Sequence, residues 1–233
     1  MINAIVFDNN RDYIVREISS RGLLDVVLPN GLTLRHNSDT IAPHRTTLLF
    51  VDCSLSILKN LQISNLADVG TGSGIIGLSI AKRIPKLNLL ASDIKKGILR
   101  VVQHNASVNS IENIELFLNK DGVWLSEYDC DIDFIVANPP FVGKKEYSNK
   151  ELLERHPEIM LEPVHAIRTN DDEGIEPYID IFLNSQKLNT KYFLFYCNSS
   201  NVDRLENFYK GRHCRTKSYK GACGSDRFLF IER

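Results

Sequence analysis

The sequence predicts an α/β fold in which helices cover both faces of a mainly parallel β-sheet. Apolar runs of strand length alternate with longer amphipathic segments from residue 46 to the end of the 233-residue sequence. Gly, Pro or Asp residues follow several of the apolar runs, as expected where a strand ends in a turn. Near the start, an Asn-Gly pair between two apolar runs predicts an additional short β-hairpin.

The hairpin is expected to belong to an N-terminal appendage of residues 1–45. Its strands would cover residues 23–28 and 32–34, with Asn30 and Gly31 in the turn. Residues 46–233 would then form the main domain, which begins with an amphipathic helix at residues 46–59.

The main domain is expected to consist of strand–helix units joined by right-handed crossovers. Its strands are predicted at residues 66–69, 88–92, 114–118, 132–137, 192–197, 213–219 and 227–232. Its later helices are predicted at residues 75–84, 95–109, 173–188 and 202–210. Ligands of such sheets bind beyond the carboxyl ends of the strands, so motifs at these ends are candidates for a functional site.

The composition is that of an ordinary globular protein. With 43% hydrophobic and 24% charged residues and a formal net charge of -1, the sequence does not predict disorder or bulk binding of nucleic acid. Five scattered cysteines without a CxxC pair make a structural zinc site unexpected, so no metal is predicted. The odd cysteine count and the lack of a signal peptide favour the cytoplasm, and no apolar run approaches the ~20 residues that span a bilayer.

A glycine-rich turn follows the first predicted strand of the main domain. Residues 68–74 read Asp-Val-Gly-Thr-Gly-Ser-Gly, and such a turn lets the backbone approach a nucleotide-like ligand closely. A dinucleotide fold fits less well, because the carboxylate of Asp68 would repel a pyrophosphate but could accept a hydrogen bond from an ammonium group. Asp93 ends the next strand, where it could bind ribose hydroxyls. The turn could also be a simple connection, but Asp93 at this interval favours a ligand site.

About 65 residues further on, Asn138-Pro139-Pro140-Phe141 follows another predicted strand. The two prolines fix the backbone and leave free carbonyl groups beside the Asn138 side chain. A planar NH2 group could donate one proton to the Asn138 oxygen and one to the Pro139 carbonyl, while Phe141 covers its flat face. By itself the run could be a rigid turn, but its place after a strand favours a corner that positions a planar nitrogen.

Together, these two motifs resemble those of class I S-adenosylmethionine-dependent methyltransferases. Within this class the chain resembles the HemK/PrmC group, the glutamine N5-methyltransferases of peptide-chain release factors. Residues 162–167 (Glu-Pro-Val-His-Ala-Ile), 172–174 and 178–181 also match the group, as does the stretch at 217–227. The similarity covers roughly residues 41–233, and it implies a Rossmann-like sheet of seven strands with the last strand antiparallel.

The resemblance also implies roles for single residues. The glycine turn would line the methionine part of S-adenosylmethionine, Asp93 would bind the ribose, and Asp121 and Gly122 would lie near the adenine. The candidate cofactor-binding residues are therefore Asp68, Gly70, Thr71, Gly72, Ser73, Gly74, Asp93, Asp121, Gly122 and Asn138. The candidate catalytic residues are Asn138, Pro139, Pro140 and Phe141. The implied partner is a protein with an exposed glutamine, such as a release factor.

Other acceptors remain open, because the helical N-terminal domain of the bacterial enzymes has no counterpart in the predicted appendage. The Asn-Pro-Pro-aromatic run is shared with methyltransferases of adenine N6 and guanine N2, and a small amide or amine is a further alternative. A non-catalytic partner subunit would also keep the fold. Six basic residues between Arg204 and Lys220 could contact RNA, but an ordinary exposed surface is favoured. Packing or surface roles are likewise favoured for His44, His156 and His165.

Overall fold

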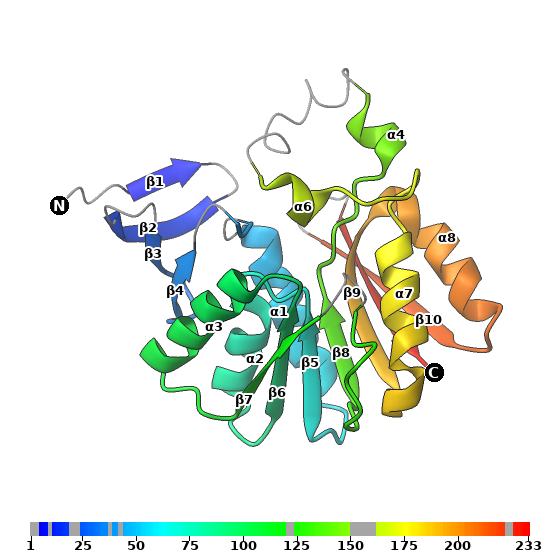
Figure 1. Ribbon diagram of the computed structural model, residues 1–233, viewed down its shortest axis with the longest axis horizontal. Coiled ribbons are helices and arrows are strands. Elements are labelled where there is room, and N and C mark those ends of the chain that lie inside the picture. The colour runs from blue at the N-terminus through cyan, green and yellow to red at the C-terminus, as the bar shows by residue number, and fades with distance from the viewer. Residues whose placement is uncertain are drawn as a thin grey trace.

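The computed structural model describes residues 5–8, 11–18, 24–36, 39–41, 44–119, 124–149, 162–221 and 226–233. These residues form a central β-sheet with helices on both faces, and a second, smaller sheet that precedes it in the chain (Figure 1). Among the helices in these ranges, none combines the length and the apolar character needed to cross a bilayer.

The central sheet of the described residues has seven strands in the order β10-β11-β9-β8-β5-β6-β7. Strand β11 runs antiparallel to both of its neighbours, and the other neighbouring strands are parallel. The predicted sheet with an antiparallel last strand is therefore confirmed. The strands are β5 (Asn65–Val69), β6 (Asn88–Asp93), β7 (Ile114–Leu118), β8 (Phe134–Ala137), β9 (Tyr192–Asn198), β10 (Arg215–Lys220) and β11 (Asp226–Glu232).

The strand order reverses direction at β5. From β5 the chain builds outward through β6 and β7 on one side, and it then returns to add β8 and β9 on the other side. Such a switch point leaves a crevice beyond the carboxyl ends of the two central strands. The glycine turn follows β5 and the Asn-Pro-Pro-Phe corner follows β8, so the topology brings the two predicted motifs together.

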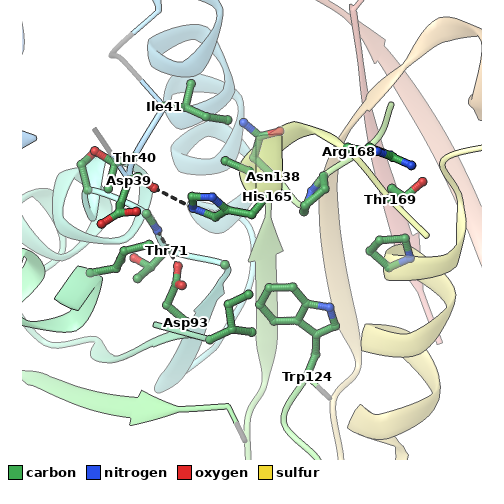
Figure 2. Close-up of a pocket in the computed structure, with 18 of the residues that line it drawn as sticks. Asp39, Thr40, Ile41, Thr71, Asp93, Trp124, Asn138, His165, Arg168 and Thr169 are labelled. Carbon is green, nitrogen blue, oxygen red and sulfur yellow. Dashed lines mark hydrogen bonds between the residues drawn. The ribbon is translucent and has the colours of Figure 1, made fainter. Parts of the chain in front are cut away.

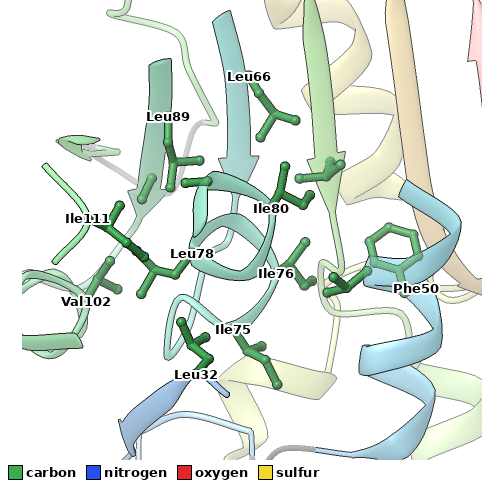
Figure 3. Close-up of a cluster of buried hydrophobic side chains, with 14 of the residues drawn as sticks. Leu32, Phe50, Leu66, Ile75, Ile76, Leu78, Ile80, Leu89, Val102 and Ile111 are labelled. Carbon is green, nitrogen blue, oxygen red and sulfur yellow. The ribbon is translucent and has the colours of Figure 1, made fainter. Parts of the chain in front are cut away.

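Two helical layers bury alternate residues of the sheet. One layer contains α1 (Arg45–Leu58), α2 (Ile75–Arg83) and α3 (Lys96–Val108); the other contains α7 (Glu176–Asn184), the 3-10 helix η3 (Ser185–Leu188) and α8 (Ser199–Lys210). In β5, Leu66 packs into the first layer (Figure 3), whereas Ala67 and Val69 belong to the buried cluster of the second. Burial on both faces explains why these strands are apolar runs without alternation.

Most predicted helices lie within a few residues of their observed positions. The last one begins at Ser199 and not at residue 202, because the side chain of Asn198 caps it by accepting a hydrogen bond from the Ser200 N–H at 3.3 Å. The predicted helix at 173–188 is shorter and divided into α7 and η3. Two one-turn helices, α4 (Lys144–Tyr147) and α6 (Val164–Ile167), were not predicted.

The first strands of the chain form a four-stranded antiparallel sheet, which we call the N-terminal sheet. Its strands, in the order β1-β2-β3-β4, are β1 (Ile5–Asp8), β2 (Arg11–Ile18), β3 (Leu24–Val27) and β4 (Thr33–His36). The predicted hairpin is confirmed as β3 and β4, with Gly31 at a φ of 81° in the turn. Strands β1 and β2 were not predicted, and in β2 a register shift between Val15 and Glu17 breaks the two-residue alternation that marks a strand.

The N-terminal sheet packs against the first helical layer. Leu28, Leu32 and Leu34 are buried in the same cluster as the apolar side chains of α2 and α3. The Asn30 side chain, in the hairpin turn, donates a hydrogen bond to the hydroxyl of Ser79 on α2 at 3.0 Å. The N-terminal sheet thus shares the core of the main domain.

Candidate active site

A cavity of about 330 Å³ lies beyond the carboxyl ends of the central strands (Figure 2). Its size falls in the range of about 300–1,000 Å³ that is typical of small-molecule sites. Segments far apart in the sequence contribute to its wall, including Asp39, Gly72, Asp93, Trp124, Asn138 and His165.

The glycine turn forms the floor of the cavity. Gly70, Gly72 and Gly74 have φ values of 72°, 54° and 83°, which residues other than glycine rarely adopt. The N–H groups of Gly70 and Thr71 both donate to the Ser92 carbonyl at 2.9 Å, which ties the turn to β6. A Cβ atom at Gly72 would meet nothing within 4 Å, so the backbone lies open to a ligand at this point.

Asp68 supports the turn from below. It is fully buried, and its Oδ2 accepts hydrogen bonds from the Thr71 hydroxyl at 2.7 Å and from the Gly77 N–H at 2.9 Å. Its Oδ1 has no hydrogen-bond partner among the described residues, and burial raises the pKa of this carboxyl to about 6. Asp68 does not belong to the described cavity wall, so its predicted contact with the cofactor ammonium stays a prediction.

Asp93 lies at the end of β6 and does line the cavity. Its two carboxylate oxygens accept hydrogen bonds from the N–H groups of Gly72 and Lys95, each at 3.2 Å. Burial raises the pKa of the Asp93 carboxyl, and these N–H donors partly oppose that effect. Each oxygen has a second lone pair, so the carboxylate can still accept hydrogen bonds from ligand hydroxyls. The other predicted residues near the adenine, Asp121 and Gly122, lie outside the described residues.

Trp124 forms another part of the wall, although the sequence analysis gave it no role. It is buried except for 9% of its surface, and its ring lies close to the glycine turn. A Cβ atom at Gly70 would be 3.4 Å from the Trp124 Cη2 atom, so the absence of a side chain there lets the indole approach.

The Asn-Pro-Pro-Phe corner borders the same cavity through Asn138 and Pro140, while Pro139 is buried. The Oδ1 atom of Asn138 is buried and accepts no hydrogen bond from any described residue. The ring of Phe141 packs against Tyr196, with ring centroids 6.0 Å apart, and it does not belong to the described cavity wall. Its stacking on an acceptor group therefore stays a prediction.

A distant segment braces this corner. The N–H groups of Phe141 and Val142 donate to the Ile167 carbonyl at 3.1 and 2.8 Å, and the Thr169 N–H donates to the Val142 carbonyl at 3.0 Å. Gly174 has a φ of 75°, and a Cβ atom there would come within 2.0 Å of the Phe141 carbonyl oxygen. The residues that match the HemK/PrmC group after the corner thus hold its backbone in place.

A polar cluster at the cavity was missed by the sequence analysis. The Lys95 ammonium donates to Asp39 Oδ1 at 2.8 Å and lies 3.3 Å from His165 Nδ1. The Nε2 atom of His165 is 3.1 Å from the Asp39 carbonyl oxygen (Figure 2). Because an ammonium group can only donate, Nδ1 accepts and Nε2 donates. These three residues are far apart in the sequence, so no local pattern marks them. Nearby, His44 pairs with Glu162 at 2.9 Å, and His156 lies outside the described residues.

Residues 49–160 match the profile of the methyltransferase small domain family. The chain is a class I methyltransferase of the HemK/PrmC-like type. The cofactor of this class is S-adenosylmethionine, and the residues fit it: the open backbone at Gly72 and the carboxylate at the end of β6 both border the cavity.

The methyltransferase is similar in sequence to bacterial release factor glutamine methyltransferases. It is 28% identical over 194 residues to the protein of Buchnera aphidicola subsp. Baizongia pistaciae, covering 82% of this chain and 67% of that protein. It is 33% identical over 139 residues to the protein of Flavobacterium psychrophilum, covering 56% of this chain and 47% of that protein. The chain thus spans about half to two thirds of the length of these relatives.

Solved structures of other methyltransferases share the fold. The catalytic domain of human METTL16 in complex with MAT2A 3′UTR hairpin 1 aligns with a TM-score of 0.67 at 15% identity, covering 88% of this chain and 75% of that one. The human methyltransferase 10 domain containing protein aligns with a TM-score of 0.61 at 14% identity, covering 88% of this chain and 89% of that one. At this identity the likeness shows the fold alone.

Proposed function

We propose that this methyltransferase transfers a methyl group from S-adenosylmethionine to the side-chain amide nitrogen of a glutamine in a protein, such as a peptide-chain release factor. The observation that carries the proposal concerns Asn138, a residue of the cavity wall, whose Oδ1 atom is buried and has no hydrogen-bond partner among the described residues. A buried acceptor without a donor costs about 1–3 kcal/mol, and turning this oxygen toward an N–H group of the acceptor molecule would remove the cost for the oxygen.

The corner suits a primary amide, which presents two N–H donors in one plane. One would bind the Asn138 oxygen and the other the carbonyl of Pro139. A half turn of the Asn138 amide exchanges its oxygen and nitrogen without changing the space that it fills, so the oxygen can face the acceptor. Bound S-adenosylmethionine supplies an electrophilic methyl group. The chain would contribute mainly position and polarisation of the N–H bonds.

The names of the curated relatives support glutamine as the acceptor. Several relatives at 26–33% identity are release factor glutamine methyltransferases. A cytoplasmic location belongs to this proposal, because peptide-chain release takes place on ribosomes. The free thiols of Cys53, Cys130, Cys197 and Cys214 are in keeping with a reducing compartment.

A nucleic-acid base as the acceptor is less well supported. Two residues of the basic stretch that could have contacted RNA are paired with carboxylates: Arg204 pairs with Glu173 at 2.7 Å, and Lys210 pairs with Glu206 at 2.6 Å. Arg212 lies over the ring of Phe208, 3.7 Å from its centroid. These contacts are those of an ordinary exposed surface.

The proposal can be tested by transfer of labelled methyl groups from S-adenosylmethionine into a lysate of cells that lack this enzyme. We expect the label to be lost on protease treatment and kept on nuclease treatment, with the Asn138→Ala variant as the inactive control. Peptide mapping should then place the label on a glutamine, and replacing that glutamine by asparagine should abolish labelling. Label lost to nuclease would instead identify a base as the acceptor.

A further inference from the structure

Strand β4 is at the edge of the N-terminal sheet, and side chains of α3 take the place of a further strand along it. Asn105 accepts a hydrogen bond from the Arg35 N–H at 2.7 Å and donates one to the Arg35 carbonyl at 2.8 Å. Asn109 does the same with Thr33, at 2.9 and 2.6 Å. Asn105 and Asn109 are four residues apart, which is about 6 Å along a helix, and Thr33 and Arg35 are two residues apart, which is about 6.6 Å along a strand. The spacing of the two amides therefore equals that of alternate residues of β4.

The two asparagines differ in their remaining amide proton. Asn105 donates it to the carbonyl of Ser73 in the glycine turn at 2.8 Å, whereas Asn109 donates it to the Asn105 carbonyl within its own helix at 2.7 Å. Asn105 is fully buried, and its amide uses both protons and its oxygen in these contacts. Asn105 therefore joins the edge of the N-terminal sheet directly to the floor of the cofactor cavity.

The chain that follows β4 also reaches the cavity. Asp39, Thr40 and Ile41 belong to its wall, only a few residues after the strand ends at His36. Lys95, two residues after Asp93, holds Asp39 by an ion pair of 2.8 Å. Residues 39–41, which follow β4, thus form one wall of the cavity, while Asn105 contacts its floor through the Ser73 carbonyl.

We propose that the N-terminal sheet is a structural part of the cofactor site, and that Asn105 is the positioning residue that fixes the glycine turn relative to residues 39–41. Loss of the Asn105 amide would remove the hydrogen bonds to the Ser73 carbonyl and to the Arg35 backbone in β4 together. The inference rests on the proposed function only through the cofactor, and it requires no methyl acceptor.

The test compares Asn105→Ala with Asn109→Ala, which removes the same kind of contact with β4 one helical turn away but leaves Ser73 alone. Binding of S-adenosylmethionine and of S-adenosylhomocysteine is measured by calorimetry. We expect Asn105→Ala to weaken both affinities about 10-fold, and Asn109→Ala to weaken them less than about 2-fold. The free energies of unfolding of both variants are measured by denaturant titration, and both should fall, because each variant loses contacts with β4.

Equal affinities of the two variants for the cofactor would overturn the proposal, whether both match the wild type or both are weakened alike. A second variant, Lys95→Met, removes the half-exposed ion pair with Asp39 and does not depend on the buried amide for folding. It should weaken cofactor binding about 3-fold, and wild-type affinity in this variant would count against the role of residues 39–41. Wild-type protein that binds the cofactor but methylates no glutamine would refute the proposed acceptor and leave this test intact.

Discussion

The two halves of the site differ in how their polar groups are satisfied. On the cofactor side, the chain itself supplies hydrogen-bond partners for the Thr71 hydroxyl, the Gly72 N–H and both oxygens of Asp93. On the acceptor side, the Asn138 oxygen has no partner in the described parts of the chain. The difference indicates that these cofactor-side groups are held in place before any ligand arrives, whereas in the proposed function the substrate supplies the missing partner on the acceptor side.

The largest effect should come from removing the Asn138 amide, whose oxygen has no partner among the described residues. Asn138→Ala is expected to lower kcat by roughly 10²-fold, because a positioning hydrogen bond is lost. Its affinity for S-adenosylmethionine should stay near that of the wild type, since the cofactor half keeps its own contacts. Steady-state kinetics and calorimetry check the two parts. A loss of cofactor affinity as large as the loss of kcat would show that Asn138 also holds the cofactor, so that the two halves are not separate.

The brace of the corner offers the next largest effect. Gly174→Ala places a Cβ atom 2.0 Å from the Phe141 carbonyl oxygen. Residue 174 also has a φ of 75°, which residues with a side chain rarely adopt. Turnover should fall about 10- to 30-fold through displacement of the corner. The free energy of unfolding should fall by roughly 1–3 kcal/mol.

Gly97→Ala is the matched control for this substitution. Gly97 lies in α3, and a Cβ atom there would meet nothing within 4 Å, so activity should not change. The unfolding midpoint in denaturant should rise slightly, since alanine favours a helix over glycine by about 1 kcal/mol. Unchanged turnover in Gly174→Ala would show that the corner does not depend on its distant brace.

A smaller effect is expected on the cofactor half. Asp93→Ala should weaken the affinity for S-adenosylmethionine about 10-fold, because ligand hydroxyls lose an acceptor and the Gly72 N–H loses its partner. At saturating cofactor, kcat should remain within a few-fold of the wild type. A variant with normal KM for the cofactor and low kcat would reverse the roles assigned to the two halves.

Asp68 is the exception on the cofactor side, since its Oδ1 has no partner among the described atoms. Its folded pKa of about 6 exceeds its ordinary value of 3.8, so between these values the folded state holds a proton that the unfolded state has lost. Stability contributed by this group therefore falls as the pH rises from about 4 to about 6. Asp68→Asn lacks this titration, and relative to the wild type it should gain roughly 1 kcal/mol of stability between pH 5 and pH 7. Denaturant titrations at both pH values measure the gain. If the free energies of unfolding of Asp68→Asn and the wild type differ by the same amount at pH 5 and pH 7, Asp68 is ionised at both pH values.

The two halves also differ in how far the sequence could predict them. The glycine turn contacts β6, the next strand along the chain, so a local pattern defines it. The brace of the corner comes from Ile167 and Gly174, and nothing within the Asn-Pro-Pro-Phe run indicates that contact. Alternation of strands and helices predicted a mainly parallel central sheet, whereas its antiparallel last strand was implied only by the resemblance to class I methyltransferases. Lys95 and His165 could not be predicted as neighbours, because their contact depends on the packing of separate segments.

The indole beside Gly70 gives this enzyme a built-in optical signal. The sequence contains one tryptophan, and Trp124 lines the cofactor cavity with most of its surface buried. A ligand that enters the cavity changes the polarity around this single fluorophore, and no other indole contributes background emission. Cofactor occupancy should therefore be readable from intrinsic fluorescence without a label, in stopped-flow time courses as well as in titrations.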